Sequence, residues 1–494
     1  MAALASVLKR LNLTIVLLIG LGVRLIGLVS RPIWYDEAFS LLVARGDTLA
    51  FPFATDVHPP LYYLLLSFWT ALWGDSIAIA RLFSIVLSLV VIFLAYQICL
   101  ILFDKEIAVW SGLLLAVSPF LVHYAQEIRM YSLLTVFVLL AAYAYWRATR
   151  EQGWLWWALF AASAALAQYN HNLAVFFLLP LASWPLLTRN WKNLFKIGIA
   201  STLALLVYIP WLLGLLAQVD AVRAAYWIEQ PGVVDIFRVL IMFVSNLPVP
   251  PVWLPVSLAS ALFLVILAGW HTIKRYRQGH EKRQISIWLM MMAFLPMALM
   301  FLVSFWLPVF LHRAFLPSAV FFLIWLIWSF QGADVPKIIR NAAFGILLIN
   351  SVVGIYMHYS YGGFPYVPYN EGRTAWLENV SGDEVIVHSN KLSMLPSHFL
   401  DTDRQHRYVI DAPGSGSDTL SEASQAALAV HSYESIADAA NNSDGVWFII
   451  FNQAIKEYQD LDEGTHPHLA WLQENYKLAE SQQWGNLILY HFER

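Results

Sequence analysis

The chain has 494 residues, of which 59% are hydrophobic and 13% are charged, and its formal net charge is −3. A soluble globular protein carries about 25% charged residues, so this composition excludes an ordinary soluble domain and indicates an integral membrane protein. The single cysteine excludes a disulfide within the chain. Residues 1–364 carry 23 Lys and Arg against 14 Asp and Glu, whereas residues 365–494 carry 7 against 19. This shift, with the loss of long apolar runs, predicts a membrane domain at 1–364 and a small soluble domain at 365–494.

Long apolar runs recur along the first 360 residues. A helix needs about 20 mostly apolar residues to cross a bilayer. By that rule we expect eleven spans, at residues 10–29, 77–103, 107–122, 130–147, 154–168, 172–188, 194–217, 252–271, 285–306, 314–330 and 339–357. The first resembles a signal peptide but lacks a small-x-small cleavage site, so we expect it to stay as a helix. The stretch LYYLLLSFW after His58-Pro59-Pro60 predicts an interfacial helix in a long first loop.

Basic residues decide the expected orientation, because short cytoplasmic loops are enriched in Lys and Arg. With a cytoplasmic N-terminus, the inner loops carry fifteen basic residues, and the run HTIKRYRQGHEKR (271–283) is the strongest group among them. The outer loops then carry eight basic residues, all of them arginine. We therefore expect a multi-pass protein with its N-terminus in the cytoplasm and its C-terminal domain on the outer side.

Polar and aromatic clusters fall on this predicted outer face. The segment SRPIWYDEAFS (30–40) places Asp36 and Glu37 directly after the aromatic pair Trp34 and Tyr35. Carboxylates close to lipid are costly, and they often mark a functional site. The same pair could instead only stabilise the start of an interfacial helix, since carboxylates favour helix N-termini. The combination of several such clusters on one face favours a functional interpretation.

The transfer of a sugar from a lipid phosphate needs a base, positive charge for the leaving phosphate and aromatic rings for the sugar. The base candidates are Asp36 and Glu37. The candidates for the donor phosphate are Arg129, Arg313 and Arg81, because the planar guanidinium matches phosphate oxygens, although each could equally anchor a helix end. The expected substrate-lining residues are Trp34, Tyr35, His58, Tyr62, Tyr63, Glu127, Tyr131 and His171. A divalent metal ion is the one candidate cofactor, with the candidate ligands Asp36, Glu37, His58 and Glu127.

The tail after residue 365 predicts a small α/β domain. DEVIVHS, HRYVID, GVWFIIFN and NLILYHF are strand candidates, and SEASQAALAV and HLAWLQENY are helix candidates. The tail contains no motif for a metal, a nucleophile or a phosphate loop. It could cap the active site, select the acceptor or stabilise the protein, and the sequence leaves these roles open.

An ordered series of segments resembles a known superfamily. The segments are RPIWYDEAFS (31–40), HPPLYYLLLSFWTALWGDSIAIARLFS (58–84), SPFLVHYAQEIRMYSLL (118–134) and HRAFLPS (312–318). They resemble the GT-C glycosyltransferases, and within them the bacterial family 39 and aminoarabinose-transferase-like branch related to protein O-mannosyltransferases. The resemblance implies a mainly α, polytopic GT-C fold with a large first outer loop and interfacial helices. It also implies an inverting transfer from a polyprenyl-phosphate sugar at the outer leaflet of a bacterial inner membrane.

Within that resemblance, Asp36 matches the catalytic acidic residue after the first span, and Glu37 matches its partner. Glu127 and Arg129 match the second polar cluster, and His58 matches the histidine of the first loop. The late segment reads His-Arg-Ala-Phe where related sequences often have an Arg-Tyr pair. This departure bears on the phosphate role predicted for Arg313.

The predicted function is therefore the transfer of a sugar from a polyprenyl-phosphate donor to a glycolipid, polysaccharide or other cell-envelope acceptor. The alternative within the enzyme class is a protein O-glycosyltransferase or O-mannosyltransferase. A different class is a lipid or sugar transporter or flippase, although the chain shows no repeated halves with broken helices; a scaffold with an inactive site is a further alternative. The expected partners are the lipid-linked donor, membrane lipid and an acceptor glycan or lipid, with no nucleic acid.

Overall fold

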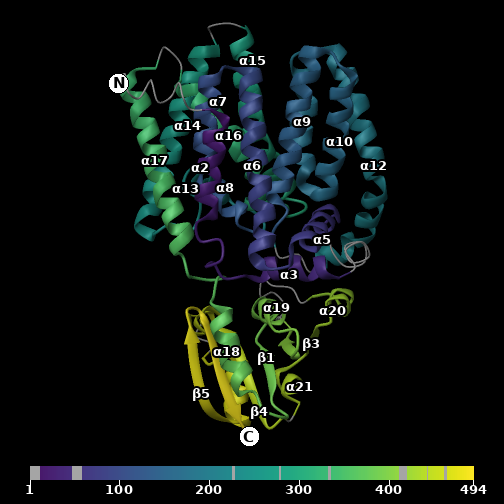
Figure 1. Ribbon diagram of the computed structural model, residues 1–494, viewed down its shortest axis with the longest axis vertical. Coiled ribbons are helices and arrows are strands. Elements are labelled where there is room, and N and C mark those ends of the chain that lie inside the picture. The colour runs from purple at the N-terminus through teal and green to yellow at the C-terminus, as the bar shows by residue number, and fades with distance from the viewer. Residues whose placement is uncertain are drawn as a thin grey trace. The chain divides into compact units, whose positions relative to one another are not determined.

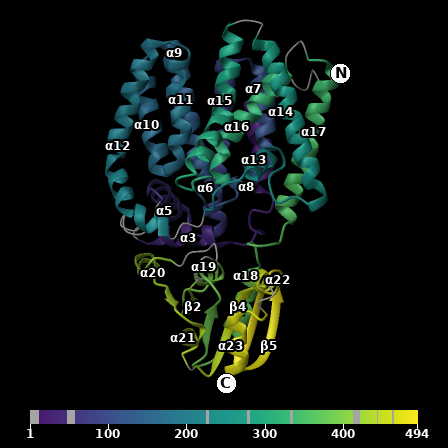
Figure 2. The ribbon, with the colours of Figure 1, turned by 180° about the vertical axis from the view of Figure 1, so that it is seen from behind.

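The structure is a computed structural model that describes residues 12–46, 58–224, 228–276, 280–331, 335–410, 420–441, 443–460 and 464–494 (Figures 1 and 2). Its internal contacts divide the chain into two compact units. The helical unit comprises Met1–Leu28, Arg81–Asp220 and Ile228–Ser360. The loop–tail unit comprises Val29–Ala80, Ala221–Trp227 and Tyr361–Arg494, so the first long loop clusters with the tail.

The helical unit is an antiparallel bundle (Figure 1). Its helices are α2 (Leu13–Leu25), most of α6 (Ile77–Leu102), α7 (Lys105–Ala116), α8 (Pro119–Ala125), α9 (Tyr131–Glu151), α10 (Trp154–Asn170), α11 (Val175–Leu187), α12 (Trp191–Ala224), α13 (Val233–Ser245), α14 (Leu254–Tyr276), α15 (His280–Val303), α16 (Leu316–Phe330) and α17 (Lys337–Ser360). Every side chain of α16 is buried, because this helix is apolar on all sides and the other helices surround it.

Each of the eleven predicted apolar runs is helical over most of its described length; residues 10 and 11 of the first run lie outside the described residues. Among the described residues, seven helices are long and apolar enough to cross a membrane, or eight if the bent pair α7–α8 counts as one span. The remaining predicted runs correspond to α2, α10 and α11, which are shorter. The structure therefore confirms a polytopic helical protein, and eleven crossings stay a prediction.

A sharp bend between α7 and α8 shapes the surroundings of the second polar cluster. The two helices meet at an angle of 60°, and Pro119 begins α8, where its missing N–H leaves no hydrogen bond unmade. On α17, a Cβ at Gly354 would lie 2.7 Å from Cγ of Pro119 and closer still to the carbonyl oxygen of Ser245. Only glycine allows α17 to approach this closely, and the approach brings the end of α17 against α8.

The loop–tail unit combines two short helices of the first loop with a mixed sheet. The helices are α3 (Tyr35–Arg45) and α5 (Leu61–Trp73), which pack against each other. The sheet has the order β3-β2-β1-β4-β6-β5. Strands β1 to β4 are parallel, whereas β6 pairs antiparallel with both of its neighbours, β4 and β5. The strands are β1 (Val385–His388), β2 (His406–Val409), β3 (His431–Tyr433), β4 (Gly445–Phe451), β5 (Lys477–Trp484) and β6 (Leu487–Glu493).

Both faces of this sheet are covered. All seven residues of β4 are buried, because alternate residues enter hydrophobic clusters on opposite faces. The tail helices are α18 (Tyr369–Asn379), α19 (Lys391–Leu400), α20 (Glu422–Leu428), α21 (Ile436–Ala440), α22 (Asn452–Asp460) and α23 (Pro467–Asn475). The four predicted strands and the two predicted helices of the tail are present, so the predicted α/β character of the tail is confirmed.

Candidate active site

The acidic pair lies in the first turn of α3. Asp36 and Glu37 are 8% and 1% exposed, so both carboxylates are buried despite their charge. They sit where the helix dipole favours negative charge. The hydroxyl of Ser40 donates to the carbonyl oxygen of Asp36 at 2.9 Å and so reinforces this turn. The structure therefore places the predicted base candidates on a rigid element.

Aromatic rings and cations surround α3. Trp34, directly before the helix, meets Tyr366 edge-on with ring centroids 6.1 Å apart. The guanidinium of Arg31 lies 3.9 Å from the centre of the same Tyr366 ring. Within α3, Tyr35 stacks on Phe39 at 6.4 Å. The predicted aromatic residues Trp34 and Tyr35 thus flank the acidic pair.

Helix α19 of the tail packs against α3 within the loop–tail unit (Figure 1). The ammonium of Lys391, at the start of α19, lies 5.6 Å from the centre of the Tyr35 ring. The guanidinium of Arg45, at the end of α3, lies 4.2 Å from the Phe399 ring and 2.9 Å from a carboxylate oxygen of Asp75. Each end of α3 therefore has a cation–aromatic contact with the tail.

The first-loop tyrosines belong to the same unit. Tyr62 and Tyr63, both fully buried, lie at the start of α5 and meet edge-on at 5.9 Å. The ring of Tyr63 also meets Phe39 of α3 at 6.4 Å. His58 comes just before α5 and is half-buried. The structure thus packs one predicted platform, Tyr63, against the helix that carries the acidic pair.

The second acidic residue, Glu127, lies in a buried hydrogen-bonded network of the helical unit. A carboxylate oxygen of Glu127 is 3.3 Å from Nε2 of His123. Nδ1 of His123 is 3.3 Å from Nδ1 of His358, and Nε2 of His358 is 2.7 Å from Oε1 of Gln126. The amide nitrogen of Gln126 donates to the carbonyl oxygens of Arg24 and Ile26 at 2.6 Å and 2.7 Å.

This network determines where a proton resides. Because the Gln126 amide nitrogen donates elsewhere, its oxygen accepts, and Nε2 of His358 must carry hydrogen. Nδ1 of the neutral His358 ring is then an acceptor, so Nδ1 of His123 donates to it. Nε2 of His123 faces a carboxylate oxygen of Glu127, and this contact is favourable when one proton lies between the two atoms. The network can therefore hold one proton at the His123–Glu127 pair.

A third cluster forms around the ring of Tyr131. The guanidinium of Arg313 lies 5.6 Å from the centre of this ring, and the rings of Tyr131 and His171 are 5.9 Å apart. Nδ1 of His171 accepts from the backbone N–H of Leu173 at 3.2 Å. Arg129 is 4% exposed and lies two residues before Tyr131 in the chain. The structure therefore brings together three predicted site residues, Tyr131, His171 and Arg313.

Arg81 has a structural contact. Its guanidinium donates to the carbonyl oxygen of Leu28 at 3.0 Å, and the residue is 1% exposed. One turn later on α6, the hydroxyl of Ser84 donates to the carbonyl oxygen of Glu127 at 2.6 Å. Arg81 thus ties the end of the first helical segment to α6, next to the residue that holds the Glu127 backbone.

A further ion pair neighbours Arg313. Nε2 of His312 lies 3.4 Å from a carboxylate oxygen of Asp235 in α13, and Arg238 binds the same oxygen at 2.9 Å. Partial burial raises the pKa of Asp235. The backbone N–H of Gly232 and the nearby His312 and Arg238 together lower this pKa by more than burial raises it. The net pKa lies below its usual value. Asp235 is thus an ionised group beside the predicted phosphate-binding segment.

The structure assigns no set of ligands to the predicted metal ion. The described residues contain no group of three or more His, Cys, Asp or Glu side chains that could hold a metal ion. Asp36, Glu37 and His58, which share the loop–tail unit, therefore form no such group, and in the helical unit His123 lies against the Glu127 carboxylate. A divalent metal ion stays a prediction.

The set of predicted site residues omits several members of these clusters. His123, Gln126 and His312 lie within the segments that carry the resemblance, whereas Asp235 lies outside them. For each, a polar residue among apolar neighbours was the available signal. His358 gave no signal, because it is 235 residues from His123 in the chain. Only the fold brings it to α8.

Comparisons with known proteins support the predicted resemblance. Residues 57–213, less than half of the chain, match the model of the family described as dolichyl-phosphate-mannose-protein mannosyltransferase. A search of curated proteins gives no match. The fold is similar to that of ArnT from Cupriavidus metallidurans in the apo state, with a TM-score of 0.63 and 12% identity over 99% of this chain and 98% of that chain.

Two further solved structures are similar. ArnT from the same organism bound to undecaprenyl phosphate gives a TM-score of 0.61 and 11% identity over 97% of each chain. The Archaeoglobus fulgidus oligosaccharyltransferase in complex with Zn and sulfate gives 0.55 and 13% identity over 96% of this chain and 73% of that one. At such identities these likenesses show the fold alone. With the family-model match, they support the GT-C glycosyltransferase family, as the sequence predicted.

Proposed function

We propose that this chain, which has the fold of the GT-C glycosyltransferases, transfers a sugar from a polyprenyl-phosphate donor to a cell-envelope acceptor. The acceptor class that we propose is a glycolipid or polysaccharide at the outer face of a bacterial inner membrane. The observation that carries the proposal is the acidic pair in the first turn of α3, in a chain whose fold matches that of ArnT along almost its whole length.

The proposed chemistry is an inverting displacement. A carboxylate oxygen of Asp36 accepts the proton of the attacking hydroxyl, and the hydroxyl oxygen bonds to the anomeric carbon of the donor sugar. The bond from this carbon to the phosphate oxygen breaks, and the phosphate leaves with the electron pair. Glu37, buried beside Asp36, keeps negative charge next to the base and thereby favours uptake of the proton.

The phosphate gains charge as it leaves, so it needs fixed positive groups. The proposal assigns this role to Arg129 and Arg313, and gives Arg81 a supporting role because its guanidinium already binds the Leu28 carbonyl. The Tyr131 ring next to Arg313 limits the orientations of that guanidinium. Trp34 and Tyr35, which are partly exposed, supply rings against which a sugar can pack, and the fully buried Tyr63 supports α3 through Phe39.

Protein is the second candidate acceptor. The family model that matches residues 57–213 is described as a dolichyl-phosphate-mannose-protein mannosyltransferase, and this description favours a serine or threonine hydroxyl. The ArnT likeness extends over more of the chain. The acceptor fraction of the assay below distinguishes the two.

The proposed topology has eleven crossings, with the N-terminus in the cytoplasm and residues 365–494 on the outer side as a separate soluble domain. The basic run HTIKRYRQGHEKR supports this orientation. The helices longer than 18 residues supply most of the crossings. Cysteine labelling at single sites in the tail and in the 271–283 loop would test the assignment.

The decisive experiment measures sugar release and transfer by the purified full chain. A panel of undecaprenyl-phosphate sugars serves as donors, and a native envelope extract, separated into lipid, polysaccharide and protein fractions, serves as acceptor. Wild type is compared with Asp36→Asn. Since a general base contributes about 10²- to 10⁴-fold, we expect transfer to fall by at least about a hundredfold.

The matched control is Asp444→Asn, which makes the same change at an exposed aspartate of the tail and should retain full activity. The labelled acceptor fraction identifies the acceptor class. If folded wild type turned over none of the donors, or if Asp36→Asn kept wild-type activity, the proposed function would be wrong.

A further inference from the structure

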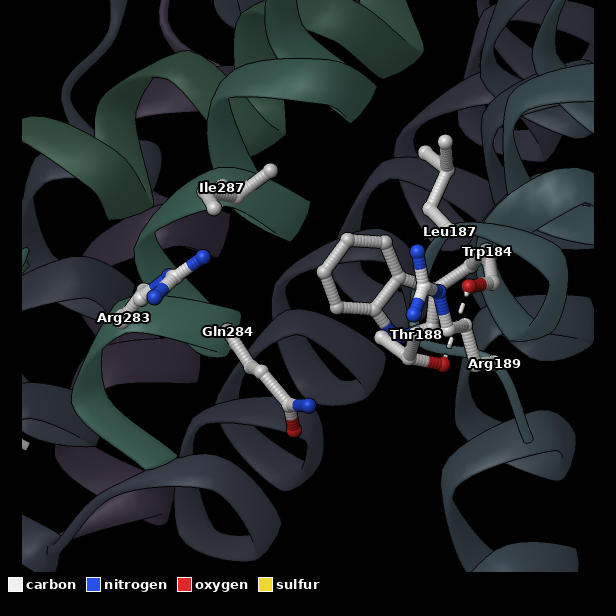
Figure 3. Close-up of a pocket in the computed structure, with 7 residues that line it drawn as sticks. All are labelled: Trp184, Leu187, Thr188, Arg189, Arg283, Gln284 and Ile287. Carbon is white, nitrogen blue, oxygen red and sulfur yellow. Dashed lines mark hydrogen bonds between the residues drawn. The ribbon is translucent and has the colours of Figure 1, made fainter. Parts of the chain in front are cut away.

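A pocket with a polar mouth lies between the end of α11 and the start of α15, entirely within the helical unit (Figure 3). Its volume is about 290 Å³, and its polar lining residues are Thr188, Arg189, Arg283 and Gln284. Figure 3 shows Arg283 and Gln284 on one side of the pocket and Arg189 and Trp184 on the other. The two arginines therefore come from different helical segments and flank one opening.

An apolar groove adjoins this pocket. It has a volume of about 520 Å³, shares Leu187 and Ile287 with the first pocket, and is otherwise lined by residues of α15, namely Met290, Met291, Phe294, Leu295 and Ala298. From Ile287 to Ala298 the helix advances eleven residues, or about 16 Å at 1.5 Å per residue. This length is about half of the roughly 30 Å hydrocarbon core of a bilayer. The groove therefore has the length of a hydrocarbon chain in one leaflet.

The backbone of Arg189 has a left-handed conformation at the end of α11. Its φ is 54°, in the left-handed region that favours glycine or asparagine. This residue ends α11 in a left-handed turn, in which the backbone N–H of Arg189 donates to the carbonyl oxygen of Leu186 at 3.1 Å and that of Asn190 donates to the carbonyl oxygen of Pro185 at 2.8 Å. Asn190 then caps α12, because its side-chain oxygen accepts from the backbone N–H of Asn193 at 3.1 Å. The turn between α11 and α12 thus places Arg189 beside the pocket that it lines.

The local charge favours an anionic occupant. The run from residue 274 to 283 carries five basic residues and the single acid Glu281. Lys192, near Arg189, is committed to the side chain of Gln152 at 3.2 Å. A cation-rich mouth above a chain-length apolar groove matches a lipid whose head group is a phosphate, since guanidinium groups bind phosphate oxygens in pairs.

We propose that this groove binds one anionic membrane phospholipid. Its phosphate lies between Arg189 and Arg283, and one acyl chain follows Met290, Phe294 and Ala298 along α15. The head group thus sits at the end of the bundle predicted to be cytoplasmic. This end carries residues 188–190 and the start of α15, opposite to the end at which α9 begins (Figure 2). The site is independent of the proposed sugar transfer.

The test uses the full chain in detergent, titrated with phosphatidylglycerol or phosphatidylcholine of identical acyl chains, with bound lipids counted by native mass spectrometry. We expect one phosphatidylglycerol to bind at least tenfold more tightly than phosphatidylcholine. The variant Arg189→Gln/Arg283→Gln should lose this tenfold preference. The control Lys337→Gln/Arg340→Gln, which removes two cations from the start of α17, should keep it.

A second variant tests the groove without touching the cations. Ala298→Trp, at an exposed position of α15, should fill the far end of the groove and weaken phosphatidylglycerol binding at least tenfold. Equal occupancy by both lipids, or unchanged preference in the double arginine variant, would mean that only annular lipid is present and would overturn the proposal. Undecaprenyl phosphate is added as a competitor. If it displaced phosphatidylglycerol at lower concentration, the groove would be a prenyl-phosphate site and the assignment to a phospholipid would be wrong.

Discussion

Two acidic regions of this chain, the first turn of α3 and the segment around Glu127, are both buried but have different surroundings. Aromatic rings and cations contact α3, and several of them come from the tail. The side chain of Glu127 instead belongs to a chain of polar contacts through His123, His358 and Gln126. Ring packing and cation–aromatic contacts thus contribute to the first region, and a connected chain of hydrogen bonds forms the second.

The two regions should differ in how well they tolerate substitutions. A cation over an aromatic ring contributes about 0.5–2 kcal/mol and has no strict direction. A buried hydrogen bond fixes direction and protonation, and its loss leaves a buried polar group unsatisfied, at about 1–3 kcal/mol. Substitutions near Glu127 should therefore have sharper effects than substitutions around α3 that leave the acidic pair intact.

Among variants that leave the acidic pair intact, the largest effect is expected from the hydrogen-bonded region. Glu127→Gln removes the charge that shares a proton with His123, and we expect sugar transfer to fall about a hundredfold. His358→Leu removes the acceptor for His123 and should lower transfer about tenfold. Because both residues act through His123, the double variant should resemble Glu127→Gln alone, with a coupling of about 0.5–3 kcal/mol.

The control for this cycle is Asn350→Leu, which removes another buried polar group of α17, one that pairs with Ser245. It should lower stability to a similar extent and show no coupling to Glu127→Gln. Multiplicative effects of Glu127→Gln and His358→Leu, together with an unchanged pH profile of transfer, would remove the basis for a shared proton.

The contrast also explains what could be predicted from the sequence. Asp36 and Glu37 were found because their aromatic neighbours are contiguous in the chain, and the apolar runs located the helices by length alone. His358 was missed because its partners come from distant segments. Helix α19 was missed because Pro396 lies inside it, and proline in a sequence argues against a helix interior. Two strands were missed. Strand β3 has only three residues, and the sequence of β5, KLAESQQW, is polar and mostly exposed.

An intermediate effect on stability is expected for the tail when the pH is lowered. Burial lowers the pKa of both His466 and His468 to about 4, and the unfolded value is about 6.5. These folded-state values are depressed, so protonation favours unfolding, and stability falls as the pH drops from about 6.5 towards 4. A shift of this size corresponds to about 1–3 kcal/mol per residue at most.

Hydrogen-exchange protection factors of β4 and α23 in the full chain, measured between pH 7 and pH 4, check this expectation. His466→Gln should flatten the dependence, whereas His431→Gln, at an exposed histidine, should leave it unchanged. Protection that stays constant over this range, or that changes equally in both variants, would contradict a contribution from buried neutral histidines. If the contacts of α3 with the tail stabilise α3, its amides should also lose protection as the pH falls.

The smallest effect is expected from the cation–aromatic contact between the tail and the start of α3. Lys391→Met keeps the length of the side chain but removes the cation 5.6 Å from the Tyr35 ring. We expect the amides of α3 to exchange about 2- to 30-fold faster, which corresponds to about 0.5–2 kcal/mol. The control Lys477→Met, at an exposed position of β5, should leave α3 unchanged. If α3 exchanged at the wild-type rate in Lys391→Met, packing between α3 and α19 would suffice without the cation. The ring-and-cation description of this region would then apply only to its other end, where Arg45 meets Phe399.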